Sequence, residues 1–235
     1  SAIFAGIACA TKWPGVFLLF TYTVLLINSK HLKPLIYFIL IPPLIYLASY
    51  IPYFMLGYGP SDFIELNRQI WWYQTNLKAT HSYASPWWSW PLNLYPVWYF
   101  VDYQKDKIAN IFASGNPIVF WFGFVGLIFT IWDYLKNRSE KLLVIIFGYL
   151  IFWLPWSISP RIMFLYHYCP SVPFLSLALG YQLSKLYPTK TLLLTIIIVL
   201  MLVGFLLTFP FLTGIPLPKN IMELFFYTNL TKNPF

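Results

Sequence analysis

Charged side chains are scarce in this sequence of 235 residues: only 9% are Asp, Glu, Lys or Arg, against about a quarter in an ordinary soluble domain. In their place, 59% of the residues are hydrophobic and 22% are aromatic. A soluble fold could not bury so much apolar surface, so a lipid bilayer must be the solvent for most of the chain. The low charge therefore excludes a water-soluble globular protein.

Cysteine and acidic metal ligands are also rare. Cys9 and Cys169 lie in apolar stretches, which indicates small packing residues and excludes a disulfide framework. The three histidines stand in no cluster with Asp or Glu, so neither a metal site nor a cofactor is predicted. The formal charge is +8, but the basic residues form no stripe, which excludes nucleic acid as a partner.

Long apolar runs predict about six membrane-spanning helices, at about 20 residues for each crossing. They lie at Ala2–Ile27, Leu35–Leu56, Pro117–Leu135, Leu142–Ile158, Ile162–Leu183 and Thr191–Leu212. The predicted fold class is an all-α, polytopic membrane protein with a single membrane domain. Residues 1–56 hold two spanning helices, 57–116 one large extracytoplasmic loop, 117–212 a four-helix region and 213–235 an extracytoplasmic tail. The first residues lack Met and a basic signal region, which predicts a fragment of a longer protein.

Basic residues gather in alternate connections between the spans. They are Lys30 and Lys33, then Lys136, Arg138 and Lys141, then Lys185 and Lys190. The positive-inside rule places these three connections in the cytoplasm and the large loop on the opposite side. We therefore expect an integral, multi-pass membrane protein whose loop is extracytoplasmic.

The first half of the loop, GYGPSDFIELNRQIWWYQTNLKAT, is typical of an amphipathic helix on the membrane surface. Ser61 or Asp62 is the predicted N-cap, and Glu65 follows Asp62 by three residues. This spacing favours a capping role for the two carboxylates over a catalytic one.

The second half of the loop contains HSYASPWWSWPLNLYPVW. Pro86, Pro91 and Pro96 impose a stiff, non-helical path, so the tryptophans between them project as rigid plates. Such plates suit an interfacial aromatic belt. They equally suit a pocket for a sugar or a lipid headgroup, because sugar rings stack their C–H faces on indoles.

Three blocks resemble one family. The pattern H-x-Y-A-S-P-W-W-S-W-P-L followed by P-V-W-Y is similar to the luminal loop of bacterial protein O-mannosyltransferases, a dolichyl-phosphate-mannose–protein mannosyltransferase family of the C-type glycosyltransferase superfamily. PRIMFLYHYCPSVPFLSLALGY at 160–181 resembles a second family block, and ATKWPGVFLL a weaker third. One departure is Tyr95, where related sequences usually carry Arg.

The resemblance implies the C-terminal part of an inverting enzyme, similar in fold to C-type glycosyltransferases and lacking their N-terminal part. Such an enzyme moves mannose from a polyprenyl-phosphate-mannose donor in the bilayer to Ser or Thr of a secreted or membrane protein. It implies a bacterial plasma membrane location. The family's catalytic acidic pair lies in an upstream outer loop, so no catalytic residue is expected in this chain.

The chemistry of the resembling family needs cations at a lipid phosphate. Arg161 is the first candidate, since a guanidinium binds phosphate in a bidentate way; the alternative is a snorkelling arginine. His167 and Lys12 are further candidates, against a packing histidine and a snorkelling lysine. Pro14 and Gly15 predict that the first helix breaks or begins near Lys12. The predicted pocket residues are His81, Tyr83, Ser85, Trp87, Trp88, Trp90 and Tyr166.

Other functions stay open on the sequence alone. A related transferase could move another lipid-linked sugar to a lipid or polymer acceptor. A non-catalytic protein could bind or transport polyprenyl lipids, although the paired broken helices and repeats of many transporters are missing from the sequence. A catalytically inactive relative with a binding role is the third alternative.

Overall fold

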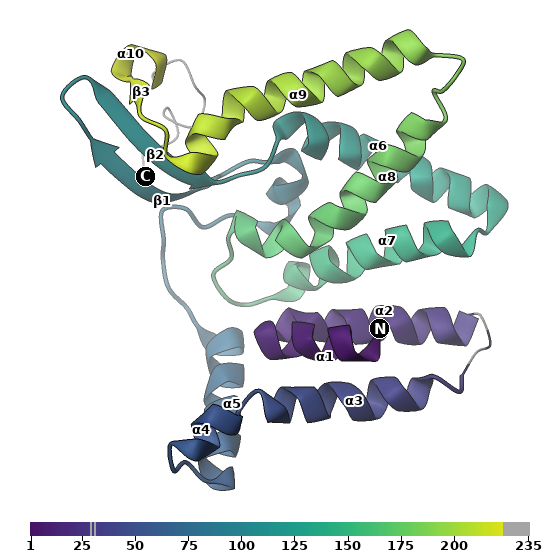
Figure 1. The fold of residues 1–235 in the computed structure, drawn as a ribbon, viewed down its shortest axis with the longest axis vertical. Coiled ribbons are helices and arrows are strands. Elements are labelled where there is room, and N and C mark those ends of the chain that lie inside the picture. The colour runs from purple at the N-terminus through teal and green to yellow at the C-terminus, as the bar shows by residue number, and fades with distance from the viewer. Residues whose placement is uncertain (29, 31, 223–235) are drawn as a thin grey trace. The chain divides into compact units, whose positions relative to one another are not determined.

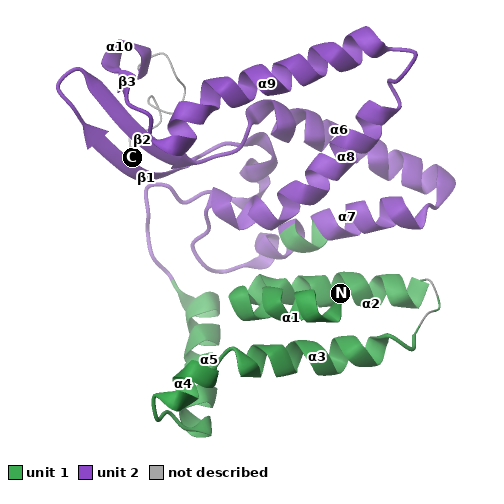
Figure 2. Cartoon of the chain, in the orientation of Figure 1, with its two compact units in different colours: residues 1–77, 150–152 green, residues 78–149, 153–235 purple. Residues whose placement is uncertain are grey.

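The computed structural model describes residues 1–28, 30 and 32–222, and the chain divides into two compact units (Figure 2). Unit 1 comprises residues 1–77 and 150–152, and unit 2 comprises residues 78–149 and 153–235. Four helical stretches of the described residues are long and apolar enough to cross a membrane: Leu35–Met55, Pro117–Asn137, Glu140–Ile158 and Thr191–Thr213. The predicted all-α, polytopic class is confirmed, and unit 2 adds one small sheet.

The first predicted span, Ala2–Ile27, is not one helix. It consists of α1 (Ala2–Thr11), a 3₁₀ turn (Trp13–Gly15) and α2 (Val16–Asn28), and Figure 1 shows α1 and α2 running in opposite directions. The predicted break near Lys12 is confirmed, whereas a continuous crossing is wrong. Gly15 permits the reversal, because a Cβ there would lie 2.4 Å from the carbonyl carbon of Ala8.

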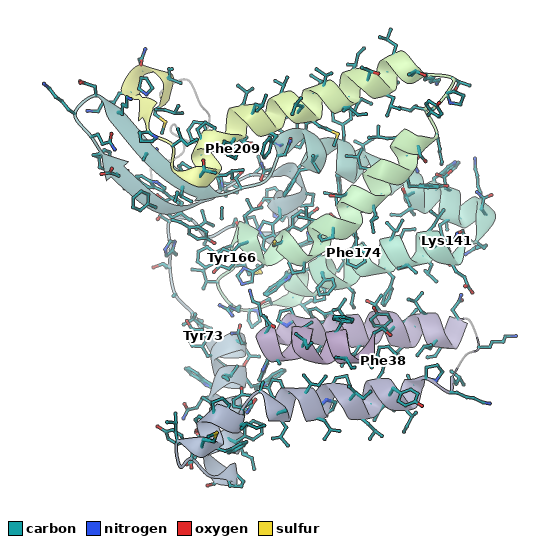
Figure 3. All side chains as sticks on the ribbon, viewed as in Figure 1. Phe38, Tyr73, Lys141, Tyr166, Phe174 and Phe209 are labelled. Carbon is teal, nitrogen blue, oxygen red and sulfur yellow. The ribbon has the colours of Figure 1, made fainter. Side chains whose placement is uncertain are left out.

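The rest of unit 1 is built from α3 (Leu35–Ala48), α4 (Ile51–Met55) and α5 (Pro60–Asn76). Phe38 of α3, labelled in Figure 3, packs with Ala2 and Ala5 in the core of this unit. Its ring lies 4.8 Å from the ring of Tyr22 on α2. This apolar contact binds α3 to both arms of the reversed N-terminal segment.

Helix α5 is the predicted surface helix, and Figure 1 shows it running across the end of α3. Its N-cap is Gly59, so the predicted cap at Ser61 or Asp62 is wrong. Asp62 occupies the third helical position instead, and its Oδ2 accepts the Gly59 N–H at 2.6 Å. Glu65 pairs with Arg68 at 2.8 Å, and this hydrogen-bonded pair holds the pKa of Glu65 below its usual range.

Trp13 ties the turn after α1 to α5. Its indole N–H donates to the Tyr46 hydroxyl at 3.0 Å, and this hydroxyl donates to Asn67 Oδ1 at 2.5 Å. The ring of Trp13 also lies 6.3 Å from the ring of Trp71. The turn and the surface helix are therefore one packed layer at the end of α3.

Unit 2 contains α6 (Pro117–Asn137), most of α7 (Glu140–Trp153), α8 (Val172–Ser184) and α9 (Thr191–Thr213). Asn116 caps α6, because its Oδ1 accepts the N–H of Ile118 at 3.0 Å. Its Nδ2 donates to the Met201 carbonyl of α9 at 2.7 Å. In Figure 1 the α6–α7 and α8–α9 connections lie at the same end of the helices. They carry Lys136, Arg138 and Lys141, and Lys185 and Lys190.

The predicted fifth span, Ile162–Leu183, begins without regular helix. Residues 159–164 are non-helical, and η4 (Leu165–Ser171) is a 3₁₀ helix that leads into α8. A 3₁₀ helix has three residues per turn, so positions three apart lie above one another. Leu165, Tyr168 and Ser171 follow this spacing, and all three are buried. The winding therefore aligns one buried row.

The loop between α5 and α6 contains a β-hairpin that we did not predict. Strands β1 (Val97–Tyr103) and β2 (Lys107–Ala113) pair antiparallel, and β3 (Leu217–Pro218) adds to β2. Phe112 of β2 packs with Phe211 of α9 and Met222 of α10 (Lys219–Met222). Of the predicted tail, residues 213–222 belong to this packing, and residues 223–235 lie outside the described part of the chain.

Candidate functional site

The tryptophan- and proline-rich segment is fixed to the non-helical segment 159–164. The Ser85 N–H donates to the Met163 carbonyl at 2.9 Å, and the Trp90 indole N–H donates to Ser85 Oγ at 2.9 Å. Trp90 lies in a short 3₁₀ helix, η2 (Trp87–Leu92), and is 0% exposed. Thus the two sequence blocks that resemble the same family pack directly against each other.

The tryptophans of this segment differ in their surroundings. Trp90 stacks on His167 with the ring centroids 6.1 Å apart and 16° between the planes. Trp87 accepts the Trp153 indole N–H on its carbonyl at 2.9 Å, which fixes η2 to α7. Trp88 is exposed. Trp90 is therefore a buried packing residue of the site, whereas the ring of Trp88 is exposed.

A left-handed turn ends η2. Asn93 has φ 56°, and its Oδ1 accepts the Gly115 N–H at 3.1 Å while its Nδ2 donates to the Gly115 carbonyl at 2.9 Å. Asn and Asp enter this backbone region more readily than other side chains do, apart from Gly. Asn93 therefore clamps the loop to the start of α6, a role that the sequence analysis missed. Tyr95 has φ 58° and an exposed side chain.

Four rings form a row that joins the loop, η4 and the hairpin. His81 meets Phe164 edge-on at 5.2 Å, Phe164 stacks on Tyr166 at 5.3 Å, and Tyr166 lies 6.4 Å from Tyr99 of β1. We call these four residues the aromatic row; Figure 3 labels Tyr166. Burial raises the pKa of Tyr99 above its usual value, so this hydroxyl is neutral at pH 7.

The remaining loop residues shape the approach to the row. His81 Nδ1 accepts the Tyr83 N–H at 3.2 Å, and the ring of Tyr83 lies 6.4 Å from that of Trp98. A depression of about 300 Å³ is lined by Ala84, Ser85, Pro86 and Met163. Of the predicted pocket residues, Ser85 lines this depression, beside the contact between the two blocks.

The candidate phosphate-binding residues are divided between the two units. Arg161 is half-buried on the non-helical segment rather than at a helix end, and its Nε donates to the Ile162 carbonyl at 3.3 Å. His167 is buried in η4, and its Nδ1 accepts the Phe164 N–H at 3.1 Å. Lys12 is exposed at the end of α1 in unit 1. Arg161, His167 and all the predicted pocket residues therefore lie in unit 2, whereas Lys12 lies in unit 1.

Possible metal ligands and free carboxylates decide which reactions the described residues can support. No group of three or more His, Cys, Asp and Glu side chains that could hold a metal ion occurs among residues 1–28, 30 and 32–222. Asp62 and Glu65 are engaged in the cap and the ion pair of α5. The predicted absence of a metal and of a cofactor stays a prediction.

These features define a class, the helical, polytopic membrane proteins. The candidate site, rich in tyrosine and tryptophan, lies at the end of the unit 2 helices away from the basic α6–α7 and α8–α9 connections. Residues 60–228 match the family model described as the C-terminal four TMM region of protein-O-mannosyltransferase. The chain belongs to this family, and the resemblance predicted from the sequence blocks is confirmed.

Curated relatives agree with this membership. A polyprenol-phosphate-mannose–protein mannosyltransferase of Mycolicibacterium smegmatis is 25% identical, over 95% of this chain and 56% of its own length. The enzyme of the same name from Mycobacterium tuberculosis is 26% identical, over 95% and 55%. The dolichyl-phosphate-mannose–protein mannosyltransferase 1 of Saccharomyces cerevisiae is 30% identical, over 53% and 17%. The chain thus spans about half the length of the bacterial relatives.

A solved structure shares the fold. It is described as the S. cerevisiae protein O-mannosyltransferase Pmt1-Pmt2 complex bound to the sugar donor. The TM-score is 0.59 at 23% identity, and the likeness covers 71% of this chain and 26% of that one. This likeness supports the polytopic membrane fold.

Proposed function

We propose that this chain is the C-terminal membrane region of an enzyme that transfers mannose from polyprenyl-phosphate-mannose to Ser or Thr hydroxyls of secreted or membrane proteins. The observation that carries the proposal is the match of residues 60–228 to the protein-O-mannosyltransferase region. The mycobacterial relatives, whose names state this donor and a protein acceptor, match 95% of the chain.

Inverting transfer breaks the bond between the anomeric carbon and the phosphate oxygen, so negative charge develops on the lipid phosphate. Arg161 is proposed as the phosphate ligand, because a guanidinium binds phosphate in a bidentate way and this half-buried residue lies on the non-helical segment that contains Phe164 of the aromatic row. His167 and Lys12 are proposed as further donors to the phosphate. The base that removes the proton from the acceptor hydroxyl is a carboxylate that we assign to no residue of this chain.

We further propose that the site end of unit 2 faces the outside of a bacterial plasma membrane. Two basic connections lie at the opposite end of its helices. One carries Lys136, Arg138 and Lys141, and the other carries Lys185 and Lys190. Such connections prefer the cytoplasm. The acceptor would then meet the site on the side to which proteins are exported.

The test is transfer of labelled mannose from polyprenyl-phosphate-mannose to a Ser/Thr peptide by the full-length protein in native membranes. Arg161→Ala should lower kcat/KM for the donor by about 10²-fold, the usual cost of one charge-stabilising donor, and Arg161→Lys should restore part of it. Arg68→Ala removes an exposed arginine paired with Glu65 and serves as the matched control with wild-type transfer.

Two outcomes contradict different parts of the proposal. Wild-type rates for Arg161→Ala would remove Arg161 from the phosphate site and leave the enzyme class standing. Transfer by the wild type to a lipid or polymer acceptor, with no Ser/Thr peptide accepted, would overturn the acceptor class.

A further inference from the structure

Strand β1 is an edge strand. The sheet order is β1-β2-β3, so β1 has a neighbour on one side only. Within the described residues, no backbone hydrogen bond joins β1 to any segment other than β2. A row of backbone N–H and C=O groups along the other side of the strand is therefore available to an added strand.

The hairpin geometry identifies these groups. Gln104 N–H donates to the Lys107 carbonyl at 3.0 Å, which makes these two residues a hydrogen-bonded pair. Such pairs alternate with non-bonded pairs along an antiparallel ladder, whose groups point away from the partner. Tyr103 pairs with Ile108, and Val101 pairs with Asn110. The N–H and C=O of Tyr103 and Val101 therefore point to the open side.

This edge lacks lysine and proline, two common protections of an edge strand against pairing. Natural edge strands are blunted by Lys or Pro or kept very short, whereas β1 has seven residues and contains neither. Its one charged residue is Asp102. Tyr99, Phe100 and Tyr103 expose 58%, 48% and 66% of their surface along it. An exposed, aromatic, seven-residue edge is a suitable template for an extended polypeptide.

The edge is continuous with the candidate site. The β1–β2 register shifts between Trp98 and Phe100, so that a bulge lies at Tyr99. The ring of Tyr99 lies 6.4 Å from Tyr166, which is the inner part of the aromatic row. A strand added along β1 would therefore extend from Tyr103 towards the row and the neighbouring segment of Arg161.

We propose that β1 binds the acceptor polypeptide as an added β-strand, through its backbone, beside the aromatic row. This inference rests on the proposed function, because it assigns a docking surface to that enzyme's protein acceptor. Strand addition recognises backbone groups, with side chains contributing only through neighbouring contacts. It therefore accepts Ser- and Thr-bearing segments of different sequence.

The first test acts on the peptide and leaves the protein unchanged. A fluorescent Ser/Thr peptide is synthesised with each backbone amide replaced in turn by an ester, and binding to the full-length protein in nanodiscs is measured by anisotropy without donor. We expect a two-residue period, with affinity about 5-fold lower at every second position, where a bonded N–H is lost. Equal affinity at all positions, or losses without this period, would overturn the inference.

The second test acts on the strand. Val101→Pro removes an N–H that points away from β2, so the hairpin ladder is kept. We expect the KM for the peptide to rise by about 5-fold or more, with kcat and the donor KM unchanged. Lys105→Pro places the same residue type in the hairpin turn, outside the ladder, and is the matched control with wild-type KM.

The readouts separate the possible failures. Periodic peptide binding without mannosyl transfer would keep the docking surface and overturn the proposed function. Mannosyl transfer without a two-residue period in peptide binding would keep the proposed function and overturn the docking surface. A dimer in light scattering that dissociates on Val101→Pro, with unchanged peptide affinity, would assign the edge to a second copy of the chain and overturn the inference.

Discussion

Replacement of Ser85 by Ala tests whether this residue holds the loop or contacts a ligand. The Ser85 hydroxyl accepts the Trp90 indole N–H at 2.9 Å, and Trp90 is fully buried. Ser85→Ala leaves that N–H without its acceptor, at a cost of about 1–3 kcal/mol in the free energy of unfolding. For a protein of this size the cost corresponds to a thermal midpoint lower by about 2–12 °C. The backbone hydrogen bond from the Ser85 N–H to the Met163 carbonyl is kept in this variant. The loss of stability therefore measures the contribution of the hydroxyl alone.

The assay is a double-mutant cycle on the detergent-solubilised protein. Ser85→Ala, Trp90→Phe and the double variant are heated, and the fraction that stays monodisperse gives each midpoint. Because either single change breaks the same bond, the double variant should be more stable than the sum of the two losses predicts. Ser184→Ala, at an exposed serine whose hydroxyl donates to the nearby Tyr181 carbonyl, is the control.

Two results would refute this reasoning. Strict additivity of Ser85→Ala and Trp90→Phe would mean that their hydrogen bond contributes nothing. An unchanged midpoint for Ser85→Ala together with a raised donor KM would mean that Ser85 contacts the substrate, as the pocket interpretation of the sequence has it.

Two further substitutions test the turn of unit 1 and the cap of α6. Gly15→Ala forces a Cβ into the backbone of α1 and should cost at least about 1–3 kcal/mol, seen as a sharp loss of folded protein after heating; Gly180→Ala, where a Cβ meets nothing within 4 Å, should be neutral or slightly stabilising. Asn116→Ala removes the helix cap and the bond to α9 and should cost about 1–2 kcal/mol in the same assay. Asn137→Ala, at the exposed far end of the same helix, should leave the midpoint unchanged; equal losses at both positions would contradict the capping role.

The apolar runs made the long helices predictable, because length and hydropathy alone decide whether a helix can cross a bilayer. The predicted Pro117–Leu135 and Thr191–Leu212 differ from α6 and α9 by one or two residues. The hairpin was missed although V-W-Y-F-V and I-A-N-I-F flank a polar Q-K-D-K turn, a pattern typical of paired strands. In a chain that is 22% aromatic, β-forming residues occur in every element, so the pattern does not distinguish strands from helices.

The sequence indicated candidate site residues but not their orientation. The family-like blocks indicated Arg161, His167 and the loop, which all lie in unit 2, whereas Lys12 lies in unit 1. Which tryptophan is buried follows from the 3₁₀ turn of η2, and sequence spacing does not reveal it, so Trp88 and Trp90 looked equivalent. Asn93 gave a weak signal as a lone Asn between two prolines. Its role depends on Gly115, a contact across 22 positions.

The winding of η4 sets the length of the segment that leads into α8. A 3₁₀ helix rises about 2.0 Å per residue and an α-helix about 1.5 Å. Over the seven residues of η4 this difference amounts to about 3.5 Å. The tighter winding therefore makes this segment that much longer along its own axis than an α-helix of the same residues would be. A change in helix type thus lengthens this segment without the insertion of a single residue.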